Sequence, residues 1–161
     1  MNFTFEITGV EATSARLMGM DERIRHELRT EMEFQMVDLV QDIVGTKLSG
    51  QLLQRKSGRL ADSITADVSD EGGSIVGRAY VAGNVPYAGI LEHGGQTAAH
   101  IITPKAALAL HFLWNGDEVF RAVVRHPGSK IPEFAYMRVG LYDMTDQILA
   151  GLQEAVERGA K

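Results

Sequence analysis

The sequence predicts an α+β fold, in which a mainly antiparallel sheet is packed by a long N-terminal amphipathic helix and a C-terminal helix. Apolar residues recur every three or four positions over residues 15–53 and again over residues 134–157, which is the spacing of amphipathic helices. Between these segments apolar residues alternate with polar ones, and glycine-rich turns separate the alternating runs. Helical and extended segments are therefore grouped along the chain, which is typical of α+β proteins with antiparallel sheets.

The composition indicates one globular domain, residues 1–161, which is large enough to bury a core without covalent cross-links. Hydrophobic residues make up 45% and charged residues 23% of the chain, as is ordinary for a soluble protein. The formal net charge of −5 does not favour phosphate binding, so we expect no sequence-specific nucleic-acid partner. The lack of cysteine excludes disulfides and Cys-based catalysis or metal sites, and is compatible with assembly in a reducing cytoplasm.

The hydropathy pattern gives no sign of insertion into a membrane. The N-terminal residues lack the basic start and the long apolar run of a secretory signal. No apolar segment approaches the roughly 20 residues that a membrane-spanning helix needs. We therefore expect a soluble protein without a membrane partner.

The first two elements differ in their period. Residues 2–8 alternate between apolar and polar side chains, which predicts a half-buried strand. The helix over residues 15–53 follows, and we expect Gly45 and Gly50 to break or kink its end. This helix is longer than the average for globular proteins, so its apolar stripe either packs wholly in the core or partly meets another subunit. The stripe consists of Leu17, Met20, Ile24, Leu28, Met32, Met36, Val40, Ile43, Leu48 and Leu52.

Two hairpins are predicted in the middle of the chain. Residues 64–68 and 75–81 alternate on either side of the turn signal at residues 70–73, which indicates an antiparallel pair. Residues 106–125 form a second strand pair around Asn115-Gly116, the strongest two-residue hairpin signal in the chain.

Short segments connect these hairpins to the closing helix. Tyr87, Ile90 and Leu91 have the spacing of one helical turn, which glycines 94 and 95 end. We expect residues 96–100 to form a mobile loop, because they are small and polar. We also expect residues 126–132 to form a loop, because two prolines interfere with strand pairing. The closing helix carries a stripe of Met137, Leu141, Met144, Ile148, Leu152 and Val156.

No catalytic, cofactor or metal motif stands out. The histidines at positions 26, 93, 100, 111 and 126 include no helical pair with an intervening glutamate, as a helical zinc site would have. Ser57 and Ser63 lack a nearby base and a nucleophile elbow. The paired glycines match neither a dinucleotide fingerprint nor a phosphate-binding loop. We therefore expect no enzyme activity, no cofactor and no bound metal.

One basic cluster, made of Arg55, Lys56 and Arg59, has two open interpretations. Its charges follow a predicted helix, where the negative end of the helix dipole favours cations. The same charges could instead contact an acidic surface of a partner.

The order of several short motifs resembles a family of tailed-phage proteins. The run from Ser57 to Ile64, SGRLADSI, is followed by Tyr87-Ala88 and then by Leu91-Glu92-His93-Gly94. This succession resembles the tail-component or tail-completion (neck) proteins of lambda-like siphophages. The step His126-Pro127-Gly128 before the closing helix is similar to the related virion-morphogenesis proteins of Mu-like phages. The resemblance covers roughly residues 20–155.

Two features depart from the family pattern. His93-Gly94-Gly95 stands where the family usually has Gly-Thr after the glutamate. The strand pair over residues 106–125, with Trp114 at its tip, is an insertion in the middle of the pattern. This insertion leaves open which position along a phage neck the protein would occupy.

The resemblance implies a non-enzymatic structural virion protein that acts in tail completion and head–tail joining at the neck. It implies a homo-oligomeric ring that contacts other phage neck and tail proteins, in the virion and in the host cytoplasm during assembly. Alternatives are a tail terminator or other minor tail protein, a stand-alone regulatory binding domain, and a small metal-dependent hydrolase. The hydrolase would require Glu92, His93 and His126 to converge around a pocket.

The residues expected to carry structural or interaction roles come from these motifs. We expect a positive φ at Gly58 and an ion pair between Arg59 and Glu92. The full set is Gly58, Arg59, Leu60, Tyr87, Glu92, Gly94, Trp114, His126, Pro127 and Gly128.

Overall fold

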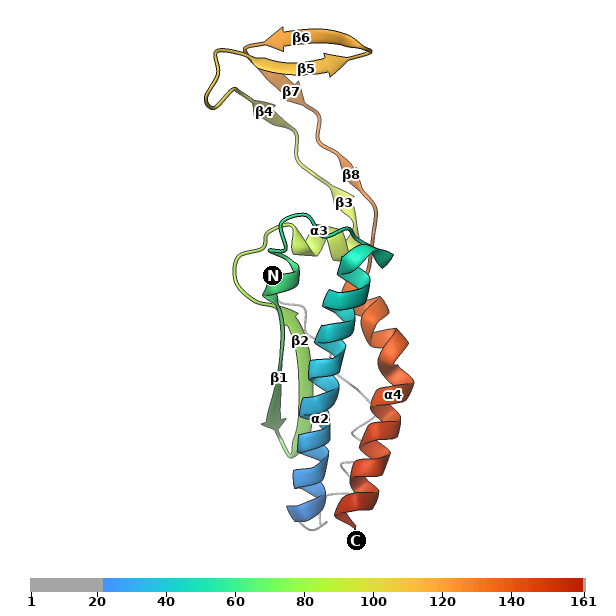
Figure 1. Ribbon diagram of the computed structural model, residues 1–161. Coiled ribbons are helices and arrows are strands. Elements are labelled where there is room, and N and C mark those ends of the chain that lie inside the picture. Colours follow the sequence, from blue (N-terminus) through green and yellow to red (C-terminus); the bar gives the residue numbers. More distant parts are fainter. Residues whose placement is uncertain (1–21, 161) are drawn as a thin grey trace.

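Two long helices run side by side in opposite directions along the body of the molecule (Figure 1). The computed structural model describes residues 22–160, so the strand predicted over residues 2–8 lies outside the described part. Helix α2 spans Glu22–Asp42 and helix α4 spans Tyr136–Gly159. Helix α2 packs against α4 on one side and against a β-hairpin on the other. These elements confirm the predicted α+β class, although the strands form separate two-stranded ribbons and not one sheet.

The long helix ends near the predicted glycines. After α2 the chain continues as the π-helical segment η1, Ile43–Gln51. Gly50 leaves the helical conformation with a φ of 128°, which confirms the predicted break at this residue. Gly45 keeps helical backbone angles, so the prediction of a kink there is wrong.

The first predicted hairpin is confirmed. A short 3₁₀ turn, η2 (Ala61–Ser63), leads into β1 (Ile64–Glu71), which pairs with β2 (Ser74–Val81) in a continuous antiparallel register. The turn residues Gly72 and Gly73 both have positive φ, as tight hairpin turns require. Gly77 on β2 lets α2 approach closely, because a Cβ atom there would lie 2.8 Å from Met36 Sδ.

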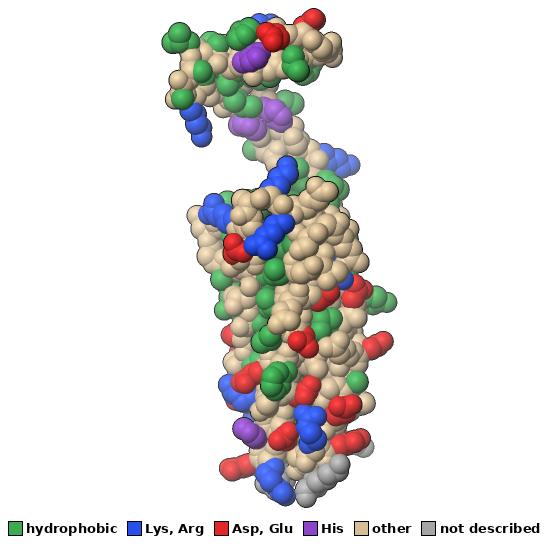
Figure 2. Space-filling view, viewed as in Figure 1, with side chains coloured by type: hydrophobic (Ala, Val, Ile, Leu, Met, Phe, Trp, Pro, Cys, Tyr) green, Lys and Arg blue, Asp and Glu red, His purple; other side chains and the backbone are tan. Residues whose placement is uncertain are grey.

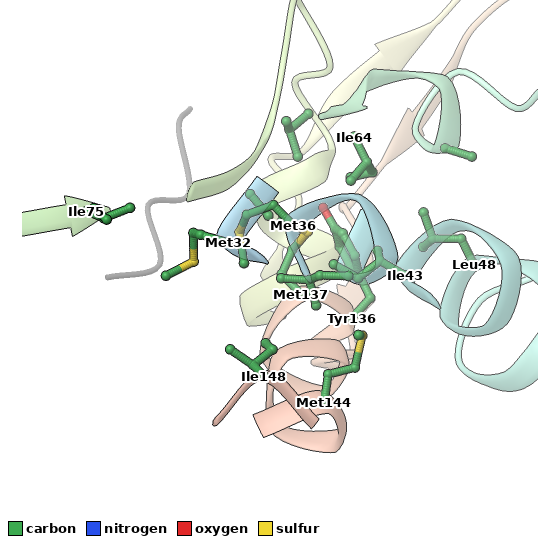
Figure 3. Close-up of a cluster of buried hydrophobic side chains, with 14 of the residues drawn as sticks. Met32, Met36, Ile43, Leu48, Ile64, Ile75, Tyr136, Met137, Met144 and Ile148 are labelled. Carbon is green, nitrogen blue, oxygen red and sulfur yellow. The ribbon is translucent and has the colours of Figure 1, made fainter. Parts of the chain in front are cut away.

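The hydrophobic core fills the space between α2, α4 and this hairpin (Figure 3). Most members of the two predicted stripes are buried here, and Leu17 and Met20 lie outside the described residues. The core residues of the two helices and η1 are Ile24, Leu28, Met32, Met36, Leu39, Ile43, Leu48, Tyr136, Met137, Met144, Ile148 and Ala155. Burial of each large apolar side chain contributes about 1.5–3 kcal/mol, so this cluster is the main source of stability.

Small residues bring α4 close to α2 and to η1. A Cβ atom at Gly159 would lie 2.6 Å from Ile24 Cα, and one at Gly140 would lie 2.6 Å from Ile43 Cγ1. At the same interface Lys47 is almost fully buried, and its Nζ donates a hydrogen bond of 2.6 Å to Asp143. The carboxylate of Asp42 lies 3.3 Å from the same ammonium, within ion-pair range but outside hydrogen-bond geometry.

The remaining strands form an arm that projects from one end of the body (Figure 1). We use the name arm for residues 95–131. It follows helix α3, Ala88–His93, which confirms the predicted helical turn. The strands are β3 (Gly95–Gln96), β4 (His100–Ile102), β5 (Leu110–Trp114), β6 (Asp117–Arg121), β7 (Val124–His126) and β8 (Lys130–Ile131).

The arm consists of three antiparallel strand pairs in succession, with a change of register before the last pair. Strand β3 pairs with β8 and β4 with β7 in a single register, and Thr97 N–H donates to Ser129 O between them at 2.9 Å. The register shifts before β5 and β6, because residues 103–109 on one side are opposed by only residues 122–123 on the other. The predicted hairpin at Asn115-Gly116 is confirmed, with φ of 53° and 92°.

Two loop predictions are only partly correct, because residues 97–99 and 127–129 have no regular secondary structure while the ends of both segments are paired. The segments 96–100 and 126–132, both expected to be loops, supply paired residues at their ends: Gln96 pairs with Lys130 and His100 pairs with His126. Pro127 directly follows the last residue of β7, and Pro132 directly follows the last residue of β8. Neither position has to donate a backbone N–H group to the paired strand, so the prolines do not prevent pairing.

Candidate functional site

The root of the arm is built around Glu92, whose side chain is fully buried at the end of α3. Its carboxylate accepts hydrogen bonds from the backbone N–H groups of Met137 at 2.9 Å and Arg138 at 3.2 Å. These groups belong to the first turn of α4, where backbone donors have no partner inside the helix. The N-cap residue of α4, Ala135, has no capping side chain, so Glu92 caps the helix from another part of the chain.

The same carboxylate holds one cation. Arg138 Nε lies 3.2 Å from Glu92 Oε1, and the guanidinium also pairs with the exposed Glu133. These hydrogen bonds raise the pKa of Arg138, with Glu133 as the larger cause. This pairing could not be read from the sequence, because Glu92 and Arg138 lie 46 residues apart in separate helices.

The predicted ion pair between Arg59 and Glu92 is wrong. Arg59 Nη2 instead donates a hydrogen bond of 2.5 Å to the backbone carbonyl of Asn84. Glu92 is buried against the first turn of α4 and uses Arg138 as its cation. The predicted positive φ at Gly58 is confirmed at 81°, and Gly58 O accepts a hydrogen bond from Asp62 N–H in the turn that starts η2.

Backbone contacts complete the arm root. Phe134 N–H donates to Leu91 O at 3.0 Å, and Ala135 N–H donates to Glu92 O at 3.1 Å. Gly94 has a φ of 68°, and a Cβ atom there would lie 2.8 Å from the backbone N of Glu133. The motif Leu91-Glu92-His93-Gly94 therefore fixes the position at which both strands of the arm leave the body.

Two predicted residues shape the arm just above its root. His126 stacks on His100 across β4 and β7, with ring centroids 5.0 Å apart, and its Nδ1 accepts a hydrogen bond from Gly128 N–H. A Cβ atom at Gly128 would lie only 2.1 Å from Thr97 O, so only glycine fits there. Pro127 lies between them on the exposed side. The His-Pro-Gly step is thus a structural part of the ribbon.

The arm carries apolar side chains without a layer to cover them. Among residues 95–131 none is buried. Apolar residues lie on both faces of the β5–β6 ribbon, since Leu110, Phe112 and Val119 share one face while Leu113 and Phe120 share the other. Figure 2 shows hydrophobic side chains distributed over the arm in this view. The most exposed are Ile101, Leu108, Leu113, Trp114, Phe120 and Val123.

Trp114 lies at the tip of the arm, as predicted, and is 65% exposed. It is the last residue of β5 and pairs with Asp117 across the two-residue turn. Glu118 is next to Asp117, and within residues 22–160 its one ionic neighbour is His111 at 3.8 Å. The tip therefore combines an exposed indole with two carboxylates.

A pocket opens at the end of the body from which the arm leaves. It has a volume of about 410 Å³ and lies between η1, residues 53–61 and α3. Three of the predicted residues, Gly58, Leu60 and Tyr87, line it, together with Arg55 and Lys56 of the basic cluster. Its apolar lining is Leu48, Leu53, Leu60, Ala61, Tyr87 and Leu91. The sequence offered no signal for this pocket, since its walls come from three separate segments.

The hydrolase alternative needed Glu92, His93 and His126 to converge. Glu92 is occupied as a helix cap, and His126 stacks on His100 within the arm. Within residues 22–160 no group of three or more His, Asp or Glu side chains is arranged to hold a metal ion. In the same part of the chain no helix combines the length and the apolar character needed to cross a bilayer.

The fold and the site together define an α+β protein with a helical body and a projecting β-arm. Comparison with known proteins gives no matching family model, no matching curated protein and no matching solved structure.

Proposed function

We propose that this chain is a structural virion protein of a tailed bacteriophage, acting in tail completion and head–tail joining at the neck. In this role it forms a homo-oligomeric ring and contacts other neck and tail proteins. Support comes from the succession of motifs over residues 57–64 and 87–94 and from the step at residues 126–128. These are short motifs, and their order carries the resemblance.

The observation that carries the proposal is the uncovered arm. A two-stranded ribbon is marginal in water by itself, and large exposed apolar patches on soluble proteins mark interaction surfaces. Burying one large apolar side chain of the arm on a neighbour would contribute about 1.5–3 kcal/mol. An assembly protein can use such a surface, because neighbouring subunits cover it in the finished particle.

The residues of the family-like motifs also fit a structural role. Glu92, Gly94 and Gly128 fix the direction and the course of the arm, as their buried or crowded positions require. None of these residues has to react for the arm to be presented. Their role under the proposal is to hold a binding element in one orientation.

The test is to assemble particles in cells that carry the phage genome with or without this gene. We expect separate heads and tails without the gene, and restoration by the full-length chain. A variant in which Asn-Gly replaces residues 97–129 should fold but fail to restore joining. A matched variant with Tyr142 and Leu149, exposed on α4, changed to serine should restore it.

Two results would contradict the proposal. Normal infectious particles without the gene would show that the protein has no essential part in joining. Tails of irregular length, attached to heads, would instead indicate the alternative role of a tail terminator.

A further inference from the structure

We propose that the tip of the arm of one copy docks into the pocket at the arm root of a second copy, with Trp114 as the inserted side chain. This inference deepens the proposed function by naming the neighbour of the arm. It rests on the proposed function only for the expectation that the contact operates inside a virion ring.

The pocket suits a large apolar side chain. Its volume of about 410 Å³ exceeds the size of an indole, and leucine, alanine and tyrosine side chains supply the apolar part of its walls. Tyr87 lines the pocket and is 37% exposed, so its ring is available to stack on another aromatic ring. Aromatic anchors that fill apolar pockets dominate the binding energy of many interfaces.

The tip of the arm has the matching shape. A two-residue turn at Asn115-Gly116 makes it narrow, and Trp114 is the large aromatic residue directly before that turn. The tryptophan has two side-chain torsions to fix on binding, so ordering it costs little entropy.

The charges at the two surfaces are complementary. Lys56 has no ion-pair partner within the described residues, and Arg55 pairs only with the exposed Asp62 at 2.7 Å. Asp117 likewise has no ion-pair partner within residues 22–160, and Glu118 has only the distant His111. Docking would place these two acidic residues beside Arg55 and Lys56 of the pocket lining, which favours association of the correct surfaces.

The contact has to form between two molecules. The arm extends away from the body, so its tip lies far from the pocket at the root of the same arm (Figure 1). Tip and pocket are different surfaces, and a contact between different surfaces produces either a ring or an open chain of subunits. Two copies could also exchange arms reciprocally, and the mass of the complex distinguishes these arrangements.

The absence of native cysteine allows a direct test by disulfide cross-linking. Purified Asn115→Cys protein is mixed with Ser57→Cys protein, since Asn115 is at the tip and Ser57 lines the pocket, and the mixture is oxidised gently. We expect a mixed disulfide-linked dimer, because docking brings the two positions within bridging distance. The control pairs Asn115→Cys with Gln153→Cys, an exposed position on α4, and should give only background cross-linking.

A charge-exchange experiment adds a second test, because a local structural defect in either variant could not restore the yield of cross-linked dimer. Lys56→Glu and Asp117→Lys are both changes at exposed positions, and each alone should lower the yield of cross-linked dimer several-fold. A mixture in which the Ser57→Cys chain carries Lys56→Glu and the Asn115→Cys chain carries Asp117→Lys should recover most of that yield.

The inference is overturned if the Ser57 pair cross-links no more than the Gln153 control over a series of rising protein concentrations. It is also overturned if, in assembled particles, the tip cysteine links only to a different virion protein. These outcomes concern the docking contact and leave the head–tail joining test unaffected. Conversely, purified copies could dock while particles made without the gene are normal. That combination would contradict the proposed function but not the docking contact.

Discussion

Glu92 shows how a single buried carboxylate can join two parts of a fold. It ends the motif that leads into the arm, and it caps the helix that follows the arm. The sequence predicted a structural role for Glu92 but an ion pair with the wrong cation. Arg59 was the expected cation because it belongs to the neighbouring motif, whereas the true partner Arg138 is contributed by α4. A motif can identify a buried charge, but only the packing of distant segments decides what compensates it.

Replacing Glu92 with alanine should lower the free energy of unfolding by roughly 3 kcal/mol. The substitution removes the cap of α4 and leaves two backbone N–H groups, at Met137 and Arg138, without acceptors in a buried environment. Urea-induced unfolding followed by circular dichroism measures the change. Glu133→Ala is the matched control, because it removes only the exposed half of the same Arg138 network and should cost less than about 1 kcal/mol. Equal effects of the two substitutions would contradict the capping role.

Because of the buried Lys47, we expect the free energy of unfolding to fall at alkaline pH. The hydrogen bond to Asp143 is the largest cause that raises the pKa of Lys47 above its ordinary value of 10.5 in the folded protein. The folded state therefore holds this proton more tightly than the unfolded state. Its stabilising contribution is complete below the unfolded pKa and is lost as the pH rises through the folded pKa.

The measurement compares urea unfolding of the native chain and of Lys47→Met from pH 8 to 11, where the substitution should flatten the alkaline decline. Burial raises the pKa of Tyr136 as well, so its ionisation adds to the decline in both proteins. The control Tyr136→Phe should remove only the contribution of the tyrosine to the alkaline decline in stability. An unchanged decline in Lys47→Met would show that the buried lysine does not link stability to pH.

The secondary structure elements could be predicted where local spacing determined them. The two helices, the β1–β2 hairpin and the turn at Asn115-Gly116 all followed from apolar periodicity and turn residues. The pairing of β3 with β8 and of β4 with β7 could not be predicted in this way, because partners such as His100 and His126 have no local signal in common. The presence of Pro127 was evidence against strand pairing, but this residue lies just beyond the end of β7.

The arm should be removable without unfolding the body. Gln96 and Lys130 are direct partners, so an Asn-Gly turn in place of residues 97–129 closes the ribbon with a favourable two-residue connection. No residue of the arm is buried, so the free energy of unfolding should change by less than about 1 kcal/mol. Thermal unfolding of both proteins provides the measurement. A loss of cooperative unfolding would mean that the arm belongs to the folding unit of the body.

The molecule as a whole is a helical body with an uncovered arm, and this shape determines which surface is available to a binding partner. The core lies entirely in the body, where α2, α4 and the first hairpin bury their apolar faces. The arm adds apolar surface without adding a second core. We expect a chain of this design to be stable before assembly and to gain contacts when a partner covers the arm, which is what the proposed role in a virion requires.

The projecting arm should be visible in solution as an enlarged radius of gyration. A compact chain of this length would have a radius of gyration of about 15 Å. We expect small-angle X-ray scattering of the native chain to give a clearly larger value, because the arm places mass far from the centre of the body. The variant with Asn-Gly in place of residues 97–129 should return to the value of a compact protein of its own length.

Self-association would also enlarge the particle, so both chains are measured with the Lys56→Glu change and over a dilution series. A concentration-independent radius that falls when the arm is removed would support the extended shape. A native radius close to that of a compact chain would mean that the arm folds back onto the body in solution. Its apolar side chains would then already be covered, and neither the docking contact nor the proposed assembly surface would be available to a second molecule.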